Sequence, residues 1–445
     1  MNQASMIPTS ELPVRRMARL ARMAARQLAT LSDAQRCEVL LANAAALWER
    51  RTEILAANER DLSAAARAVA VGRMKPALRQ RLQTNERGVA EMADRVRDVA
   101  SLRDPLGCVL AATELDEGLT LYKKSCPLGV IAIIFEARPD VIPQVAALAL
   151  KSANAVIFKG GTEASYTNEV LAAIWRDGLA QFPNVPIEAI SILQSHAQVA
   201  ELLKLQDEID LIIPRGSREL VRYVAESSRI PVLGHGEGVC HVYIDRAADL
   251  EKGFAVAFDS KVQYPAACNA METLLVHEEI APAFLPEMIA RFRAAKVEVR
   301  GCELTIALGG FSDLIPASNA DWEMEYSDLI VSIKVVASAE TAIEHIERHG
   351  SGHTESIVTE DQELARKFLN VIDAAGVYHN ASTRFADGFR YGLGAELGIS
   401  TGKLHARGPV GLAGLTTYKY ELIGAGHTVA TYSGGERSFN HRALL

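Results

Sequence analysis

The sequence predicts an α/β protein with more than one domain, on three observations. Short apolar runs alternate with amphipathic helical stretches from about residue 130 to residue 230, and such alternation is typical of βαβ units built on a parallel sheet. Residues 14–100 are rich in Ala, Leu, Glu and Arg at three-to-four spacing, which predicts helices ahead of the first strand. The length of 445 residues predicts two or three domains.

Composition excludes several classes of protein. The net charge is −8 with acidic and basic residues interspersed, which argues against a nucleic-acid binder. No apolar run reaches the roughly 20 residues that a membrane helix needs. The cysteines lie far apart without a CxxC pair, as expected of reduced thiols in the cytoplasm rather than a disulfide framework or a zinc site. They are Cys37, Cys108, Cys126, Cys240, Cys268 and Cys302.

Taken in order along the chain, the elements follow from local patterns. Residues 107–129 carry β-formers on both sides of "LDEG", which predicts an extended ribbon. The alternating segment then predicts strands at 130–135, 155–160, 189–194 and 209–214, with helices over 139–152, 162–180, 196–205 and 217–227. A second α/β segment is expected from about Leu250 to Gly408, and a β-like tail follows over 414–435.

The turn after strand 209–214 is a candidate anion site. Gly216 and Ser217 turn the chain directly into a helix. Main-chain N–H groups at a helix start, with the helix dipole behind them, suit a pyrophosphate. The alternative is an ordinary turn with Ser217 as the N-cap, and the GxGxxG fingerprint of dinucleotide-binding folds is absent.

Lys159 is the second candidate cofactor contact. It ends the apolar strand 155–160 and precedes a pair of glycines and a helix start in "FKGGTE". A lysine at this place reaches an adenosine ribose or a 2′-phosphate. A solvated lysine at a strand end is the alternative reading.

Cys268 and a run of histidines are the candidates for chemistry. Cys268 precedes an apolar run in "KVQYPAACNAMETLLV", but a single cysteine is more often buried than reactive. His345 and His349 have the four-residue spacing of zinc ligands on a helix. Because the motif is not HExxH and glycines break the helix before His353, no metal is predicted and the spacing is read as incidental.

In this order the motifs resemble the aldehyde dehydrogenase superfamily and, within it, the γ-glutamyl phosphate reductase family. The resemblance covers about residues 14–420 and rests on "FKGGTE", the Gly216-Ser217 turn, "IIFEARPDV", "VLGHGEGVCHVYID", "YPAACNAMETLLVH", "AIEHIERHGSGHTESIV" and "GLAGLTTYKY". It implies an aldehyde dehydrogenase-like fold of two doubly wound α/β domains plus a β oligomerisation flap. The implied boundaries are 1–118 with 137–255 for the cofactor domain, 256–410 for the catalytic domain, and 119–136 with 411–445 for the flap and tail.

The resemblance implies NADPH-dependent reduction of L-glutamyl 5-phosphate to L-glutamate 5-semialdehyde and phosphate, in proline biosynthesis. A cysteine thiolate expels phosphate to form a thioester, which accepts hydride where a carboxylate cannot. A non-phosphorylating NAD(P)-dependent dehydrogenase of a small aldehyde is the alternative, and a catalytically silent scaffold for a glutamate kinase is a third reading. The implied partners are the small-molecule substrate, a glutamate 5-kinase and further copies of the chain; nucleic acid and membrane are not expected.

Site residues are carried over position by position. The resemblance makes Cys268 catalytic, places Lys159, Gly216, Ser217 and Glu325 at NADP, and places Arg138, Arg384 and Asn269 at the substrate. A planar guanidinium suits carboxylate and phosphate, although a surface ion pair is the alternative for each arginine.

Two departures from the superfamily pattern matter. Ala137 stands where the superfamily has its oxyanion asparagine, so the Cys268 N–H is expected to hold the oxyanion largely alone. Gly234 or His235 stands where hydrolytic members carry a water-activating glutamate, with Glu237 displaced by a few positions. An acyl enzyme that resists water is therefore expected. The ribbon and the tail are expected to pair between subunits.

Overall fold

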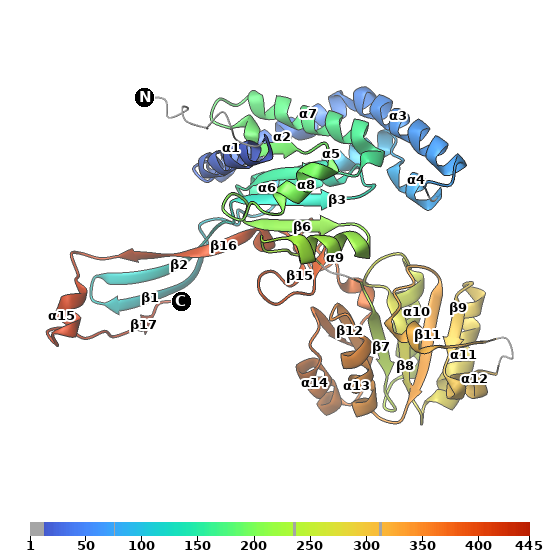
Figure 1. The fold of residues 1–445 in the computed structure, drawn as a ribbon. Coiled ribbons are helices and arrows are strands. Elements are labelled where there is room, and N and C mark those ends of the chain that lie inside the picture. The colour runs from blue at the N-terminus through green and yellow to red at the C-terminus, as the bar shows by residue number, and fades with distance from the viewer. Residues whose placement is uncertain (1–12, 75, 235–236, 311–313) are drawn as a thin grey trace. The chain divides into compact units, whose positions relative to one another are not determined.

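The structure, a computed structural model, describes residues 13–74, 76–234, 237–310 and 314–445. It divides into two compact units, which we call unit 1 (Met1–Leu233 with Gly411–Leu445) and unit 2 (Gly234–Val410) (Figure 1). Both units contain parallel sheets with helices between the strands, and the α/β class predicted from the sequence is confirmed. Within the described ranges, no helix combines the length and the apolar character that a membrane span requires.

Unit 1 begins with helices, as the sequence predicts. They are α1 (Pro13–Leu28), α2 (Asp33–Glu49), α3 (Arg51–Ala70), α4 (Pro76–Leu82) and α5 (Glu86–Ser101). Ser32 starts α2 with a capping box, in which its side chain accepts from Gln35 and the Gln35 side chain accepts from Ser32. Asn85 caps α5 through an acceptor oxygen for the N–H of Gly88.

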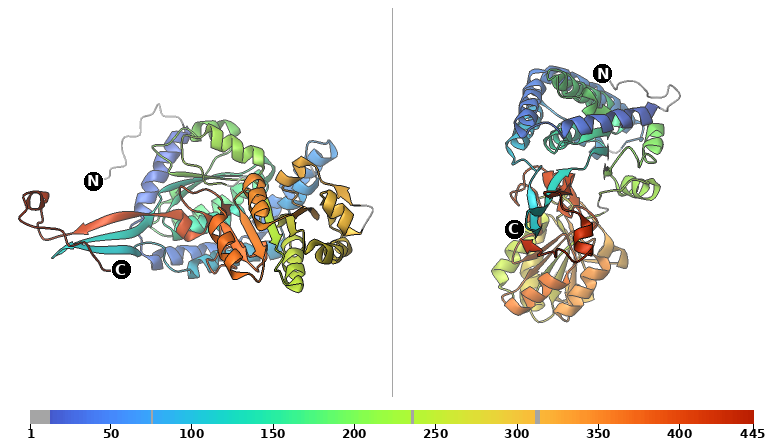
Figure 2. Two further views of the ribbon diagram at one scale, coloured as in Figure 1. Left: turned by 90° about the horizontal axis from the view of Figure 1, so that it is seen from below. Right: turned by 90° about the vertical axis from the view of Figure 1, so that its left-hand side faces the viewer.

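A parallel sheet in the order β5-β4-β3-β6 forms the centre of unit 1. The helices of unit 1 pack around this sheet (Figure 2). Every residue of β3 is buried. Residues 130–135 therefore belong to the central sheet, and not to the flap in which the sequence placed them. The bounds are β3 (Val130–Phe135), α6 (Val141–Lys151), β4 (Ala155–Lys159), η1 (Thr162–Ala164), α7 (Ser165–Ala180), η2 (Ile187–Ala189), β5 (Ile190–Ile192), α8 (His196–Leu202), β6 (Leu211–Arg215) and α9 (Arg218–Ser227).

The predicted ribbon is an antiparallel hairpin of β1 (Val109–Asp116) and β2 (Leu119–Pro127). The tail adds β16 (Thr416–Ile423) beside β2 and β17 (Arg442–Ala443) beside β1. We call these strands, with α15 (Val429–Ser433), the flap. Within one chain, β16 pairs with β2 from Thr416↔Pro127 to Ile423↔Thr120. The pairing of ribbon and tail between subunits stays a prediction.

Unit 2 is built on a second parallel sheet in the order β10-β9-β11-β8-β7-β12-β13. The unit starts at residue 234 rather than at 256, because β7 pairs with β8 and β12 and so belongs to this sheet. Its strands are β7 (Cys240–Ile244), β8 (Met271–His277), β9 (Glu298–Gly301), β10 (Ile315–Pro316), β11 (Ile330–Val336), β12 (Thr354–Val358) and β13 (Gly376–His379), with the short pair β14 (Ile399–Ser400) and β15 (Gly408–Pro409).

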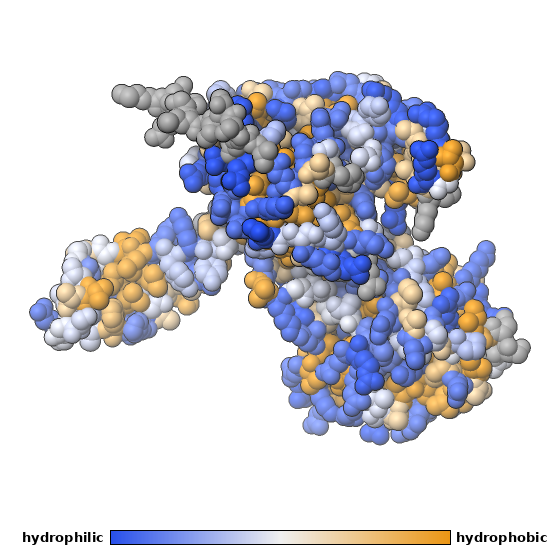
Figure 3. Space-filling view, in the orientation of Figure 1, coloured by the Kyte–Doolittle hydropathy of each residue, from blue (hydrophilic) through white to orange (hydrophobic). Residues whose placement is uncertain are grey.

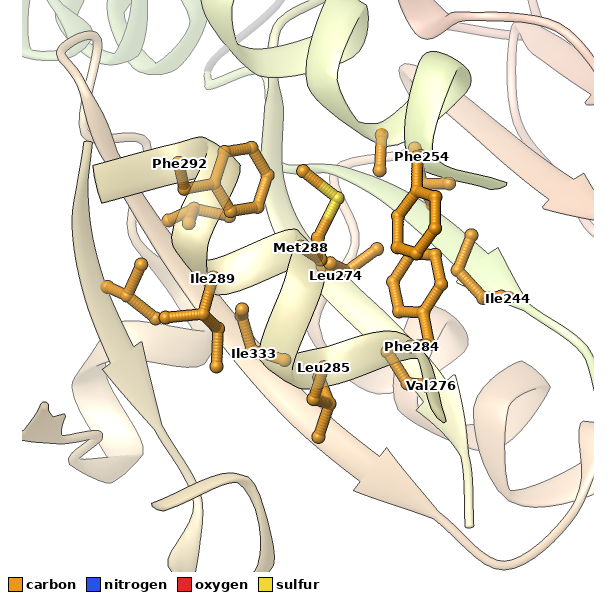
Figure 4. Packing of buried hydrophobic residues seen from close by; sticks show 14 of the residues in the cluster. Ile244, Phe254, Leu274, Val276, Phe284, Leu285, Met288, Ile289, Phe292 and Ile333 are labelled. Carbon is orange, nitrogen blue, oxygen red and sulfur yellow. The ribbon is translucent and has the colours of Figure 1, made fainter. Parts of the chain in front are cut away.

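Helices cover the unit 2 sheet on opposite faces (Figure 1). On one face the core contains Phe254 and Phe284, which stack at 4.8 Å between ring centroids, together with Met288 and Phe292 (Figure 4). Burying each such side chain stabilises the fold by about 1.5–3 kcal/mol. The remaining helices are α10 (Leu250–Val262), α11 (Ala281–Ala294), α12 (Glu303–Gly309), η3 (Asn319–Glu323), α13 (Ala339–His349), α14 (Gln362–Val371) and η4 (Thr383–Phe385) in unit 2, with η5 (Leu412–Leu415) in unit 1.

Candidate active site

Cys268 lies in the turn between α10 and β8, at the edge of the unit 2 sheet where the strands begin. β7 begins at Cys240, and β12 begins at Thr354 directly after His353. Because β7, β8 and β12 are parallel neighbours, their amino-terminal ends lie at the same edge. This topology brings residues from three distant stretches of sequence to one place.

The Cys268 thiol faces the imidazole of His353. The distance from Sγ to Nε2 of His353 is 3.2 Å. Nδ1 of the same ring lies 2.8 Å from Oγ1 of Thr354 and 3.6 Å from Sγ of Cys240. His353 is buried. An imidazole within reach of a thiol can take its proton, and the thiolate is the nucleophilic form.

Sequence reasoning missed His353, because it read the three histidines as one incidental run. In the structure they separate into two groups. His353 faces Cys268, whereas His345 and His349 lie on α13 with ring centroids 4.6 Å apart. Burial, followed by the nearby His241 and Lys334, lowers the pKa of His345 to about 2. Across the described residues, no group of three or more His, Cys, Asp or Glu side chains could hold a metal ion.

Gly238, in the glycine loop that precedes β7, packs directly against the main chain of Cys268. A Cβ atom on Gly238 would lie 1.9 Å from the Cys268 carbonyl oxygen, so only glycine fits there without movement. The N–H of Gly238 donates to Oε2 of Glu325 at 2.9 Å. Burial raises the pKa of Glu325, and the charge of Glu237 raises it further. Residue His235 lies outside the described residues.

Arg384 lies in unit 2, as does Cys268. It is 7% exposed, and its Nε donates to Oε1 of Gln263 at 2.9 Å. Burial and then the charge of Arg390 lower the pKa of Arg384, whereas an electrostatic effect of Cys268 opposes this shift. A buried guanidinium is suited to bind an anionic group of a ligand.

Asn269 supports the segment that carries Arg384. Its Nδ2 donates to the carbonyl oxygen of Ala386 at 2.7 Å. Its Oδ1 is buried without a hydrogen-bond partner among the described residues. The amide nitrogen is therefore committed to protein, and the acceptor oxygen is the part of Asn269 that remains available.

A buried ion pair, which sequence reasoning did not find, flanks the Cys268 turn. Nζ of Lys261, at the end of α10, lies 2.7 Å from Oε2 of Glu272 in β8, and both side chains are fully buried. Burial lowers the pKa of Lys261 and raises the pKa of Glu272 to about 7. The pair ties together the two elements between which Cys268 lies.

Unit 1 holds Lys159, Gly216 and Ser217, three of the four residues predicted to contact a cofactor. Nζ of Lys159 is buried and donates to the carbonyl oxygen of Gly160. Burial lowers the pKa of Lys159, and the charge of Glu163 opposes this shift. The adjacent Gly160 lines a small hollow of about 30 Å³, far below the volume of a ligand pocket. The hollow is lined by Gly160, Gly161, Thr162, Ser165, Asn168, Glu169, Ile192, Leu193 and Gln194.

The N-terminus of α9 already holds a negative group. Ser217 is the N-cap, as the alternative reading of this turn had it, and its main-chain N–H donates to Oε2 of Glu136 at 2.7 Å. A Cβ on Gly216 would lie 2.4 Å from the same oxygen. The turn thus accepts a carboxylate, as an anion site does. A cofactor phosphate bound here would have to displace Glu136.

After β3, a second glutamate, Glu163, accepts a hydrogen bond from the main chain of Ala137. Ala137 has a φ of 38°, in the left-handed region, and its N–H donates to Oε1 of Glu163 at 2.7 Å. Arg138 is exposed. Arg138, Lys159 and the Gly216-Ser217 turn belong to unit 1, whereas Cys268, Asn269, Glu325 and Arg384 belong to unit 2.

The chain is similar to known proteins over most of its length. The aldehyde dehydrogenase family matches residues 8–309. The chain is 52% identical over 443 residues, 99% of this chain and 97% of the relative, to the γ-glutamyl phosphate reductase of Synechococcus sp. (strain JA-2-3B'a(2-13)). It is 53% identical over 422 residues, 95% of each chain, to that of Natronomonas pharaonis.

Solved structures give the same picture. The γ-glutamyl phosphate reductase of Thermotoga maritima superposes with a TM-score of 0.90 at 40% identity, covering 93% of this chain and 99% of that one. An acetylating aldehyde dehydrogenase from Geobacillus thermoglucosidasius has a TM-score of 0.63 at 19% identity, covering 93% and 97% of the two chains. The second likeness is one of fold alone.

Proposed function

The chain belongs to the γ-glutamyl phosphate reductases of the aldehyde dehydrogenase family, and from this premise we propose that it reduces L-glutamyl 5-phosphate to L-glutamate 5-semialdehyde and phosphate with NADPH, in proline biosynthesis. The observation that carries the proposal is the identity of 52% over 99% of the chain to a reductase of this name. The contact of 3.2 Å between Cys268 and His353 supplies a chemical basis.

In the first half of the reaction, Nε2 of His353 takes the proton of the Cys268 thiol. The thiolate attacks the acyl carbon, a C–S bond forms, and the bond from carbon to the phosphate oxygen breaks. The proton on Nε2 passes to the departing phosphate, which would otherwise leave as a strongly basic trianion. Cys268 then carries a thioester, and His353 is neutral.

In the second half, bound NADPH supplies the hydride that reduces the thioester. The resulting thiohemiacetal on Cys268 collapses, the C–S bond breaks, and aldehyde leaves with the thiolate restored. One proton from solvent then returns to His353, so that acyl phosphate, hydride and one proton give aldehyde and hydrogen phosphate.

Arg384 and Arg138 are the proposed substrate cations. Support for Arg384 is its burial and its interaction with Cys268. Arg138 is exposed and follows the Glu136 segment in unit 1. We propose that Asn269 serves the substrate site by holding the Arg384 segment, which is consistent with its bond to Ala386.

For NADP, the proposed contacts are Lys159, Gly216, Ser217 and Glu325. The carboxylate held by the Ser217 N–H supports a ligand with an anionic group at this turn of unit 1. Glu325, in unit 2, is proposed to bind the nicotinamide ribose. Its present contact with Gly238 places it against the Cys268 loop.

The proposed partners are further copies of the chain and a glutamate 5-kinase. The flap is the proposed contact between copies, because β16 is an edge strand with exposed apolar side chains. A kinase that delivered its product directly would limit hydrolysis of the labile acyl phosphate.

One assay in the oxidative direction tests the function. The full chain is given glutamate 5-semialdehyde and NADP⁺, with and without inorganic phosphate, and NADPH formation is followed. Strict dependence on phosphate is expected, because phosphate must discharge the thioester, and Cys268→Ser should be inactive. Turnover without phosphate would favour the non-phosphorylating dehydrogenase, and no turnover in folded protein would favour a scaffold.

A further inference from the structure

A closed ring of buried contacts joins the Cys268 turn to the first residues of β7 and β12. Sγ of Cys240 lies 3.3 Å from the carbonyl oxygen of Cys268. Sγ of Cys240 also lies 3.6 Å from Nδ1 of His353. Oγ1 of Thr354 lies 2.8 Å from Nδ1 of His353, whose Nε2 lies 3.2 Å from Sγ of Cys268. Cys240, His353 and Thr354 are fully buried.

The position of the protons in this ring follows from burial and distance. Burial, followed by the charges of Glu355 and Cys268, raises the pKa of Cys240 well above its ordinary value, so Cys240 stays a thiol with one proton. Its nearest acceptor is the Cys268 carbonyl oxygen at 3.3 Å, compared with 3.6 Å to Nδ1 of His353. Of the two polar atoms near Nδ1 of His353, the Thr354 hydroxyl oxygen, at 2.8 Å, is therefore closer than the Cys240 sulfur, at 3.6 Å.

A neutral imidazole carries one proton, on Nδ1 or on Nε2. His353 can accept the Cys268 proton only when Nε2 is bare, which requires the proton on Nδ1. An acceptor at Nδ1 selects that tautomer, as the carboxylate does in serine protease triads. Resting on the proposed function, we propose that Thr354 is the positioning residue of this reaction: its hydroxyl oxygen accepts the Nδ1 proton of His353 and so turns the Nε2 lone pair toward Cys268.

The fold fixes Thr354 in this role. On the opposite side of β12, Oε2 of Glu355 accepts from the main-chain N–H of His241 at 2.8 Å and lies 2.9 Å from its Nδ1. Both side chains are buried, so this pair locks the register of β12 against β7 next to Thr354 and Cys240. A hydroxyl is neutral, so it orients the ring without adding a carboxylate charge at Nδ1. The imidazolium can then give its proton up readily to the departing phosphate.

Alkylation of Cys268 by iodoacetamide tests the proposal in the full chain, without substrate or cofactor. The rate is measured across pH, and mass spectrometry assigns the label to Cys268. The titratable groups around the pair remain in every variant; they are Arg384, Lys261, Glu272, His241 and Glu355. A change in the pH profile of alkylation therefore reports a change in how the His353 ring accepts the Cys268 proton.

Thr354→Val keeps the shape and removes the hydroxyl. We expect alkylation at neutral pH to fall by about tenfold, the equivalent of one lost hydrogen bond, and the profile to move to higher pH. Thr354→Ser should restore the wild-type profile, and Thr354→Ala provides a second variant without the hydroxyl. Thr305→Val is the matched control, since Thr305 is also buried and donates to the Ile333 carbonyl at 3.0 Å, away from the site.

The outcomes separate this inference from the proposed function. A Thr354→Val profile that coincides with the wild-type profile, while His353→Gln shifts it, overturns the role of Thr354 and leaves the Cys268–His353 pair in place. If His353→Gln also leaves the profile unchanged, the pair is wrong, and the mechanism falls together with the role of Thr354. A shift in Thr305→Val equal to that in Thr354→Val would also overturn the proposal.

Discussion

Nε2 of His353 lies 3.2 Å from the Cys268 thiol, and Cys268 acts electrostatically on the pKa of Arg384. An imidazole and a cation next to a thiol both favour the thiolate. The carbonyl oxygen of Cys268 accepts a hydrogen bond from the Cys240 thiol and packs closely against Gly238. Reactivity at Cys268 therefore depends on neighbours that hold its main chain as much as on those that face its sulfur.

Gly238→Ala tests the packing of the main chain behind the thiol. A Cβ would lie 1.9 Å from the Cys268 carbonyl oxygen, so the turn must shift. Because a displacement of about 1 Å can lower a rate by about 10²-fold, we expect kcat to fall by roughly that factor in folded protein. Gly402→Ala is the control, since its Cβ would make only an ordinary contact of 3.6 Å with Ser400. Equal activities of the two variants would contradict the packing argument.

At the residue scale, the sequence predicted site residues whose side chains have an evident chemical role, such as a thiol or a guanidinium. Cys268, Asn269, Arg384 and Glu325 are all found in unit 2 near the turn. His353 was not predicted, because its contact with Cys268 spans 85 residues and depends on β8 and β12 beginning at the same sheet edge. The Lys261–Glu272 pair depends in the same way on how α10 returns to β8.

Elements with a strong local pattern were predicted most closely. The strand at 130–135 has the bounds of β3, and Ser217 caps α9 as expected. The strand Cys240–Ile244 was not separated from the first α/β segment. The same alternation of strand and helix continues through the glycine loop, so no change of composition marks the start of unit 2.

Because His345 on α13 is buried, we expect the protein to lose stability in acid. The pKa of His345 is lowered to about 2 by burial, and by His241 and Lys334. The unfolded chain takes up this proton below its ordinary pKa near 6.5, whereas the folded chain does not. The unfolding free energy should therefore fall with decreasing pH, by up to about 1.4 kcal/mol per unit from this residue.

Urea unfolding of wild type and His345→Gln, at neutral and mildly acidic pH, measures this contribution. Glutamine keeps a polar group near Nζ of Lys334, which lies 3.1 Å from Nδ1 of His345. The variant should show a smaller loss of stability between the two pH values than the wild type. Equal losses would mean that His345 is not the residue responsible.

For the whole molecule, the structure assigns the thiol and the predicted cofactor turns to different units. The sequence predicted this division of labour but placed the boundary at 255/256 instead of 233/234. The flap forms a sheet within one chain, and the expected pairing of ribbon and tail between subunits stays a prediction.

The flap carries the prediction about assembly. Tyr418, Tyr420 and Leu422 alternate along the edge strand β16 and are exposed by 48%, 61% and 57%, and hydrophobic residues gather over the flap in Figure 3. Exposed apolar patches of this kind mark interfaces. If copies associate there, Tyr420→Lys with Leu422→Lys should lower the mass measured by analytical ultracentrifugation.

Leu404→Lys is the control for that measurement. Leu404 is fully exposed in unit 2, away from the flap sequence. Its replacement should leave the mass unchanged. An unchanged mass in the flap variant, or an equal decrease in both variants, would place the contact elsewhere.

The central claim is that Cys268 carries the acyl group between phosphate and hydride. The direct measurement is to incubate the full chain with glutamate 5-semialdehyde and NADP⁺ without phosphate, quench in acid, and locate the adduct by mass spectrometry of peptides. The account predicts a glutamyl group on Cys268 that disappears when phosphate is added before the quench. An adduct on another residue, or turnover by Cys268→Ser, would contradict it.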